Sequence, residues 1–104
     1  MPVATINDRV VNVDDEGFLT DYDDWDEDLA KVLASQIGIE LTEDHWNAIH
    51  FLRRDYKQTG ETATLRRVTT VGGIPTKELF TLFPKKPAKK MAYIAGLPKP
   101  RGCV

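Results

Sequence analysis

The sequence contains a single cysteine, and this scarcity excludes several classes of protein. One thiol cannot build a disulfide framework, and it cannot supply a metal cluster held by several thiolates. The first ten residues, MPVATINDRV, contain no apolar signal region, and no apolar run approaches the length that spans a membrane. There is no internal repeat. We therefore expect one cytoplasmic domain without a membrane association.

The sequence also lacks a recognisable set of catalytic or metal-binding residues. His45 and His50 are five residues apart, which separates them by about 140° around a helix instead of placing them on one face. The acidic run DYDDWDED at 21–28 has neither the glycine nor the distal glutamate of a calcium loop. Gly72-Gly73 lacks the lysine of a nucleotide-binding loop and is interpreted as a turn. We expect no metal, no cofactor and no self-contained active site.

Charge is plentiful but unevenly distributed. Residues 1–50 contain two basic and thirteen acidic side chains, whereas residues 51–104 contain twelve basic and three acidic ones. The formal charges of the two halves are therefore −11 and +9, although the net charge is only −2. The halves can attract each other within the fold, or the basic half can meet an anionic partner. Charge alone favours the first interpretation.

Hydrophobic periodicity predicts a mainly helical bundle preceded by a small β-hairpin. The hairpin is expected within ATINDRVVNVDDEGFLTD, where DDEG is a turn signal. Capping residues and glycines set the expected helix limits. The expected helices run from Asp23 or Asp24 to Gly38, from Thr42 to Gly60, from Thr62 to Gly72, from Thr76 to Pro84, and through KKPAKKMAYIAG at 85–96.

The segment LRRVTTVGGIPTKELFTLF at 65–83 has the form of a helix-turn-helix element, which in other proteins binds DNA. Arg53, Arg54, Arg66 and Arg67 supply positive charge near it. Its second helix, TKELFTLF, offers few side chains that could read bases, and its apolar residues suit a core or a protein contact. A DNA-binding regulator remains an alternative function, although direct DNA binding is not expected.

The most reactive side chain lies in the last segment, IAGLPKPRGCV. Pro98 and Pro100 prevent a helix from continuing, so we expect a body over 1–96 and a mobile C-terminal arm over 97–104. Cys103 is the strongest nucleophile in the chain. Six extended residues from Pro98 to Cys103 reach about 20 Å, so the thiol can enter the active site of another protein. Such a thiol can accept a persulfide sulfur and surrender it to a second nucleophile.

The neighbours of this thiol are expected to position it. Lys99 and Arg101 favour the thiolate, whereas the carboxylate of Val104 opposes it. Pro98 and Pro100 stiffen the base of the arm, and Gly102 loosens its tip. Deletion of the arm is expected to leave stability nearly unchanged, with packing of Leu97 on the bundle as the exception.

Several short motifs are spread along the chain: GFL at 17–19, Trp25, GI-LT--HW at 38–46, FLR at 51–53, LFP at 82–84 and AGLPKP at 95–100. Together with the tail, these motifs resemble the DsrC/TusE family of sulfur-carrier proteins, over nearly the whole chain. The resemblance implies a small helical bundle with an N-terminal β-hairpin and a flexible C-terminal arm, and it implies that Cys103 is the persulfide-carrying residue.

The family has two branches, which differ in their cysteines. Two-cysteine members have a second cysteine eleven positions earlier and work with dissimilatory sulfite reductase. The equivalent residue here is Ala92, so the chain resembles the single-cysteine, TusE-like branch, and Tyr93 replaces an expected lysine. That branch accepts persulfide sulfur from a TusBCD-like complex. It passes the sulfur toward the tRNA thiouridylase, with its bound tRNA, that makes wobble 2-thiouridine. The alternative is a role with sulfite reductase-like proteins in sulfur oxidation. Either role is that of a sulfurtransferase-type carrier.

Overall fold

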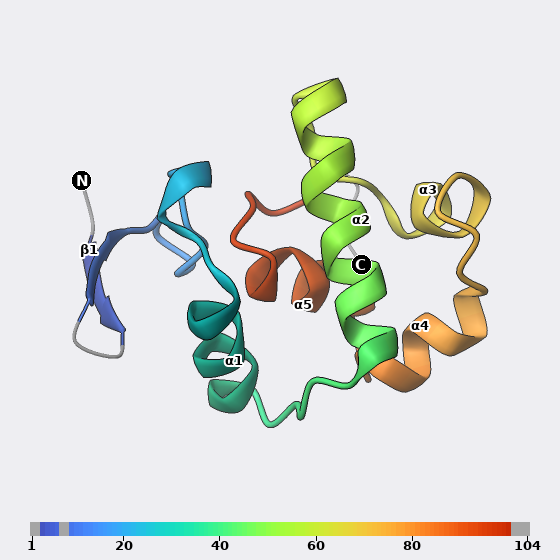
Figure 1. Cartoon of the computed structure of the whole chain (residues 1–104), viewed down its shortest axis with the longest axis horizontal. Coiled ribbons are helices and arrows are strands. Elements are labelled where there is room, and N and C mark those ends of the chain that lie inside the picture. Colours follow the sequence, from blue (N-terminus) through green and yellow to red (C-terminus); the bar gives the residue numbers. More distant parts are fainter. Residues whose placement is uncertain (1–2, 7–8, 101–104) are drawn as a thin grey trace.

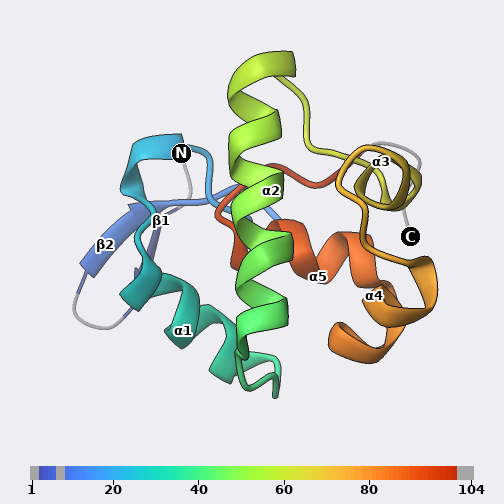
Figure 2. The ribbon, with the colours of Figure 1, turned by 45° about the vertical axis from the view of Figure 1, so that its right-hand side comes forward.

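The computed structural model describes residues 3–6 and 9–100, and it confirms the mainly helical fold with an N-terminal β-hairpin (Figure 1). Helices α2 and α5 lie in the centre, the hairpin and α1 lie on one side, and α3 and α4 lie on the other (Figures 1 and 2). The described elements are β1 (Val3–Ile6), β2 (Arg9–Asn12), the 3-10 helix η1 (Tyr22–Asp24), α1 (Glu27–Gln36), α2 (Glu43–Thr59), α3 (Leu65–Thr70), α4 (Thr76–Leu82) and α5 (Pro87–Ile94).

The N-terminal hairpin consists of two antiparallel strands in which Val3 lies opposite Asn12. The predicted DDEG turn is also present and follows β2. There the carboxylate of Asp14 accepts hydrogen bonds from backbone N–H groups within the turn. Val13 and Leu19 then form an isolated antiparallel bridge. The DDEG turn therefore extends the hairpin region, while the main strand pairing lies earlier in the chain than that turn.

Two helices begin later than the sequence predicted. Asp26 caps α1, because its carboxylate accepts a 2.8 Å hydrogen bond from the backbone N–H of Leu29, and η1 occupies the predicted start of the helix. Thr64 caps α3 in the same way. The hydroxyl of Thr62 does not cap a helix, since it donates to the carbonyl oxygen of Pro98. Several adjacent candidate caps made these starts ambiguous in the sequence.

Helix α2 begins and ends where its capping residues predicted. The Nδ1 atom of His45 accepts a 3.1 Å hydrogen bond from the backbone N–H of Thr42, so the ring proton lies on Nε2. That Nε2 atom lies 2.8 Å from the carbonyl oxygen of Leu82 and donates to it. His45 thereby joins the start of α2 to the end of α4. His50 lies elsewhere, with its Nε2 3.2 Å from a carboxylate oxygen of Glu27.

The residues just before α5 have an unusual backbone. Lys85 and Lys86 have φ values of +59° and +36°, which place two consecutive side-chain-bearing residues in the left-handed region. Pro87 is then the first residue of the helix, a position where its fixed φ is favourable. Helix α5 consequently begins slightly later than the segment predicted for it. Its predicted apolar face is confirmed, and the residues on that face are buried: Ala88, Met91, Ala92 and Ala95.

The buried apolar side chains form two clusters. The main core joins all five α-helices and Leu97, which follows α5, and a smaller core lies between the hairpin and α1. Trp25 and Tyr93 are half-buried and pack against both clusters. Within the described ranges, no helix has the length and hydrophobicity that crossing a bilayer requires.

Candidate functional site

The backbone at the end of α5 fixes the point at which the predicted C-terminal arm begins. Gly96 has φ +70° and donates its N–H to the carbonyl oxygen of Tyr93 at 3.3 Å. Leu97 donates its N–H to the carbonyl oxygen of Ala92 at 3.1 Å. Together these two bonds form a Schellman motif, which needs a left-handed residue at the glycine position. The side chain of Leu97 is fully buried, so the chain is held in the core immediately after the helix.

Side chains from other elements bind the last carbonyl groups of α5, which have no partner within the helix. The indole Nε1 of Trp25 donates to the carbonyl oxygen of Ile94 at 2.8 Å. Arg53, on α2, donates from Nη1 to the carbonyl oxygen of Ala95 at 2.8 Å. Its Nη2 donates to the carbonyl oxygen of Tyr22 at 2.9 Å. One guanidinium thus links η1, α2 and the end of α5.

The guanidinium of Arg53 is also enclosed by two aromatic rings. Its central carbon lies 3.9 Å from the ring centroid of Tyr22 and 4.1 Å from that of Trp25. Burial lowers the pKa of Arg53, while the Tyr22 side chain and Asp23 act in the opposite direction. The group nevertheless stays charged, because the pKa of an arginine starts far above physiological pH. We call Tyr22, Trp25 and Arg53 the arginine anchor.

The described part of the predicted arm, residues 97–100, contacts the body at several points. The carbonyl oxygen of Pro98 accepts a 2.7 Å hydrogen bond from the hydroxyl of Thr62. The ammonium of Lys99 donates to a carboxylate oxygen of Glu16 at 3.3 Å. Pro100 is buried. In Figures 1 and 2 the segment that follows α5 runs past α2 toward the loop that precedes α3, in agreement with the Thr62 contact.

The remaining predicted site residues, Arg101, Gly102 and Cys103, lie outside the described residues. The role of Cys103 and the division into body and mobile arm therefore stay predictions. The structure adds the position of residues 94–97, which hold the start of this segment against the body. Among the residues it describes, no group of three or more histidine, cysteine or acidic side chains is placed to hold a metal ion.

Sequence reasoning missed the arginine anchor. It treated Arg53 as one of several nearby positive charges and as part of the FLR motif at 51–53. A signal was present, because Arg53 follows Ile49 by four residues and therefore lies on the buried face of α2. A charged residue on a buried face requires partners. The identity of those partners was not accessible, since Tyr22 and the carbonyl of Ala95 are distant in the sequence.

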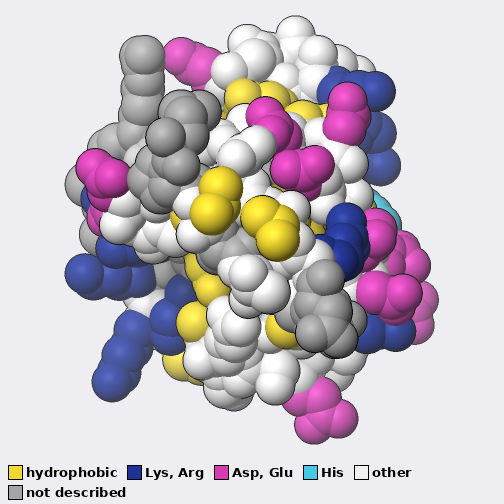
Figure 3. Space-filling view, turned by 90° about the vertical axis from the view of Figure 1, so that its left-hand side faces the viewer, with side chains coloured by type: hydrophobic (Ala, Val, Ile, Leu, Met, Phe, Trp, Pro, Cys, Tyr) yellow, Lys and Arg dark blue, Asp and Glu magenta, His cyan; other side chains and the backbone are white. Residues whose placement is uncertain are grey.

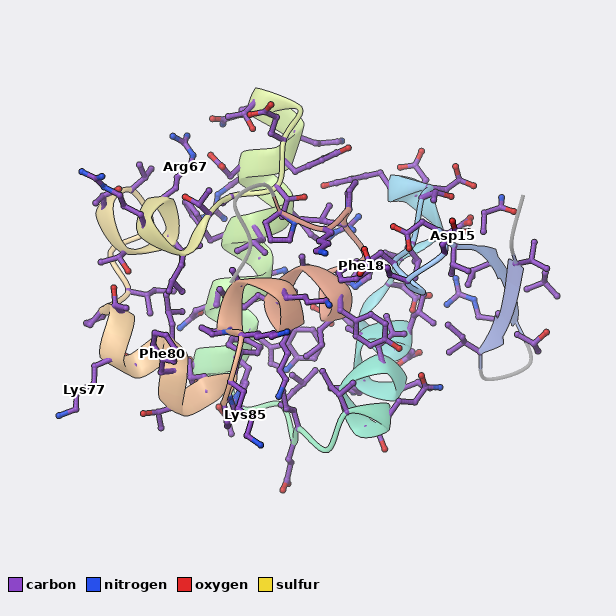
Figure 4. The ribbon with its side chains drawn as sticks, turned by 180° about the vertical axis from the view of Figure 1, so that it is seen from behind. Asp15, Phe18, Arg67, Lys77, Phe80 and Lys85 are labelled. Carbon is purple, nitrogen blue, oxygen red and sulfur yellow. The ribbon has the colours of Figure 1, made fainter. Side chains whose placement is uncertain are left out.

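The helix-turn-helix element loses part of the positive charge that the sequence assigned to it. Arg67 donates from Nε and Nη2 to the two carboxylate oxygens of Asp55, both at 2.8 Å. These hydrogen bonds lower the pKa of the buried Asp55 carboxyl. Arg53 is likewise engaged inside the protein, whereas Arg54 and Arg66 are exposed. Figure 4 shows Phe80 and Lys77 on α4, on the side of the molecule away from the hairpin.

Comparisons with known proteins agree with the fold and with the motifs. The model of the DsrC like protein family matches residues 5–104. A relative named Sulfurtransferase TusE, from Yersinia pseudotuberculosis, is 40% identical over 92% of this chain and 95% of its own length. The dissimilatory-type sulfite reductase subunit gamma of Nitratidesulfovibrio vulgaris is 36% identical and covers 100% of both chains.

A solved structure extends this agreement to three dimensions. The NMR structure of DsrC from Allochromatium vinosum superposes with a TM-score of 0.81 at 38% sequence identity, and the match covers 98% of this chain and 97% of that one. Since both the sequence and the arrangement of helices match over almost the full length, the resemblance inferred from the motifs is confirmed. The chain belongs to the DsrC-like family.

Proposed function

We propose that this protein is a sulfur carrier that holds sulfur as a persulfide on Cys103 and delivers it to an acceptor protein. The names of its relatives, sulfurtransferase TusE and DsrC, support a carrier in a sulfur relay. In the proposed relay a TusBCD-like complex in the cytoplasm donates the sulfur. The acceptor is the tRNA thiouridylase with its bound tRNA, and the product is the 2-thiouridine of the wobble position.

The observation that carries this proposal is the anchored segment 94–97. A carrier needs a reactive group that reaches into a partner, and it needs a firm base so that the partner can dock against the body. The arginine anchor and the burial of Leu97 supply the base. The covalent chain from Pro98 to Cys103 spans at most about 20 Å, which is a reach suited to a recessed active site.

The proposed chemistry balances without an oxidant or a cofactor. The Cys103 thiolate attacks the outer sulfur of a persulfide on the donor. The sulfur–sulfur bond of the donor breaks, the donor cysteine leaves as a thiolate, and a new sulfur–sulfur bond forms on Cys103. The acceptor thiolate repeats the same exchange in the second step. The roles of Lys99 and Arg101 in this exchange are to attract the approaching anionic sulfur.

The presence of one thiol bears on the choice between the two branches of the family. The residue at the position of the second cysteine is Ala92, which is fully buried and offers no sulfur. A bridge between two cysteines of the same chain is therefore impossible. This favours the TusE-like relay as the proposal, and cooperation with a sulfite reductase-like protein is the second candidate because of the gamma-subunit relative.

The test is to load the purified, reduced protein with a cysteine desulfurase, a TusBCD-type complex and L-cysteine. We expect intact-mass spectrometry to find a gain of one sulfur atom, and fragmentation to locate it on Cys103. Addition of a thiouridylase, ATP and substrate tRNA should then transfer radiolabelled sulfur to the tRNA.

The control is Cys103→Ser, which should neither gain nor transfer sulfur while its circular dichroism spectrum remains unchanged. A serine variant that still carries transferable sulfur would contradict the proposed site. Loading without any transfer to tRNA, combined with transfer to a sulfite reductase-like acceptor, would support the second candidate instead.

A further inference from the structure

A groove runs along α5 on the side that faces the turn at residues 14–18 and the end of α1. Its volume is about 420 Å³. Its floor is apolar and is formed by Phe18, Ile37 and Tyr93. The rings of Phe18 and Tyr93 meet edge to face, with their centroids 5.8 Å apart. Tyr93 is further fixed by a 3.0 Å hydrogen bond from its hydroxyl to the Oε1 atom of Gln36.

The rim of this groove is strongly cationic. Lys86, Lys89 and Lys90 line it, and they come from the residue before α5 and from the first half of that helix. The first turn of α5 has no acidic residue. These charges therefore lie near the end of the helix where its dipole already favours anions. Figure 4 shows Lys85 at this end of α5 and Phe18 near the other end.

The lysines of the rim have little compensation within the protein. Glu16 is the carboxylate in the groove lining, and its Oε1 lies 3.7 Å from the ammonium of Lys89 and 3.3 Å from that of Lys99. Among the described residues, no carboxylate lies within ion-pair distance of Lys86 or Lys90. The ammonium of Lys90 donates a hydrogen bond to the carbonyl oxygen of Pro84. Figure 3 shows Lys and Arg side chains that project at the lower left of that view, and further ones along its right-hand edge.

We propose that this lysine-rimmed groove binds an acidic segment of a partner protein, with an aliphatic side chain of that segment on the apolar floor and its carboxylates on the lysines. The existing Glu16 contact shows that the geometry of the rim suits a carboxylate. An aliphatic side chain suits the floor because Ile37 and Tyr93 are only half-buried there, whereas Phe18 is 2% exposed and offers no free ring face. A nucleic acid fits less well, since stacking of bases requires exposed ring faces, which Phe18 does not offer.

The groove lies beside the base of the C-terminal segment. Glu16 contacts both Lys89 in the groove and Lys99 in that segment. A partner carboxylate in the groove therefore competes with Glu16 for these lysines, and the bound partner stands next to the start of the segment that leads to Cys103. The inference concerns binding alone and does not depend on sulfur chemistry.

The test is an NMR titration of the reduced, isotope-labelled protein with the peptide Glu-Glu-Leu-Glu-Glu. We expect saturable shifts of the amide signals of Phe18, Lys89 and Tyr93, and weaker binding as salt concentration increases. The variant Lys86→Glu/Lys89→Glu/Lys90→Glu should bind about tenfold more weakly, since it replaces three attractive charges on the rim with repulsive ones. The milder variant Lys86→Ala/Lys89→Ala/Lys90→Ala serves if charge reversal disturbs the fold.

The matched control is Arg54→Glu/Arg66→Glu/Lys77→Glu, which makes the same change in net charge at exposed positions of α2, α3 and α4. It should keep the affinity within about twofold, because these residues lie outside the groove. Equal weakening in both charge-reversal variants would show that only net charge matters and would overturn the proposal. Absence of shifts in the groove would do the same. Groove shifts with an oligouridylate RNA but not with the peptide would assign the surface to nucleic acid instead.

Discussion

Trp25 and Gly96 pack so closely that a Cβ atom placed on Gly96 would lie 2.5 Å from Cδ1 of Trp25. The same glycine has φ +70°, which a residue with a side chain adopts at a cost of about 1 kcal/mol. Two separate constraints therefore require glycine at this position. They act together at the place where α5 ends and the C-terminal segment begins.

We predict that Gly96→Ala lowers the free energy of unfolding by about 2–4 kcal/mol, as measured by urea denaturation. The control is Gly38→Ala. Gly38 ends α1 in a matching Schellman motif with φ +75°, but a Cβ there would meet no atom within 4 Å. Its substitution should cost only about 1 kcal/mol. Equal losses in the two variants would mean that Trp25 moves aside and that the contact imposes no constraint.

A second prediction concerns the arginine anchor. Arg53→Met keeps much of the buried volume but removes both donors, so the carbonyl oxygen of Ala95 is left buried without its partner. We expect a loss of about 2–3 kcal/mol in the free energy of unfolding, the typical cost of an unsatisfied buried group. Arg53→Lys should recover only part of it, because an ammonium lacks the forked geometry. The exposed neighbour provides the control, and Arg54→Met should change stability by less than about 0.5 kcal/mol.

A third prediction separates the base of the C-terminal segment from its remainder. The sequence suggested that residues 97–104 contribute little to stability, with Leu97 as the exception. Since Leu97 is fully buried, that exception should dominate. A chain ending at Gly96 should be less stable than a chain ending at Pro100 by about 2–4 kcal/mol. Identical thermal transitions for the two truncated chains would mean that burial of Leu97 contributes nothing.

A fourth prediction follows from the pair of Asp55 and Arg67. The folded pKa of Asp55 is lowered, chiefly by the hydrogen bonds from Arg67. This pair therefore stabilises the protein at neutral pH. The contribution begins to fade as the pH falls below about 4, because the carboxylate of the unfolded chain binds a proton there before that of the folded chain does, and it is lost once the pH is below the folded pKa as well. We expect Asp55→Asn to cost about 1–2 kcal/mol at pH 7 and progressively less toward pH 3. Stability should be followed by denaturation at each pH.

Asp15→Asn is the control for this pH dependence. Asp15 is exposed in the turn after β2, and Figure 4 shows it far from Arg67. Its substitution should leave the pH profile of stability unchanged. A cost for Asp55→Asn that stays constant between pH 7 and pH 3 would show that the pair acts through packing and not through charge.

The features that the sequence predicted well depend on neighbours in the chain. Helix α2 is bounded by Thr42 and Gly60, because a capping residue and a left-handed glycine act on adjacent backbone groups. The apolar face of α5 follows from helical spacing alone. The family motifs could be recognised for a different reason, because each is a short run of specific residues.

The features that the sequence did not predict depend on contacts between distant segments. Arg53 could be placed on the buried face of α2, but its partners Tyr22 and Ala95 come from elements that only the fold brings together. The hydrogen bond between Thr62 and Pro98 is of the same kind, and it explains why Thr62 does not cap α3. Several closely spaced aspartates likewise left the start of α1 undecided in the sequence. In the structure Asp26 is the residue that caps the helix.

Lys85 and Lys86 lower the stability of the protein through their left-handed backbone, while their side chains add positive charge to its surface. Each residue with a side chain in this region costs about 1 kcal/mol, and Lys86 also precedes a proline, which restricts it further. Glycine at position 86 would relieve this strain and would remove a charge from the rim of the groove. A laboratory selection for thermal stability alone is therefore expected to replace Lys86 early. The selected protein should unfold at a higher temperature and have fewer positive charges on the rim of the groove.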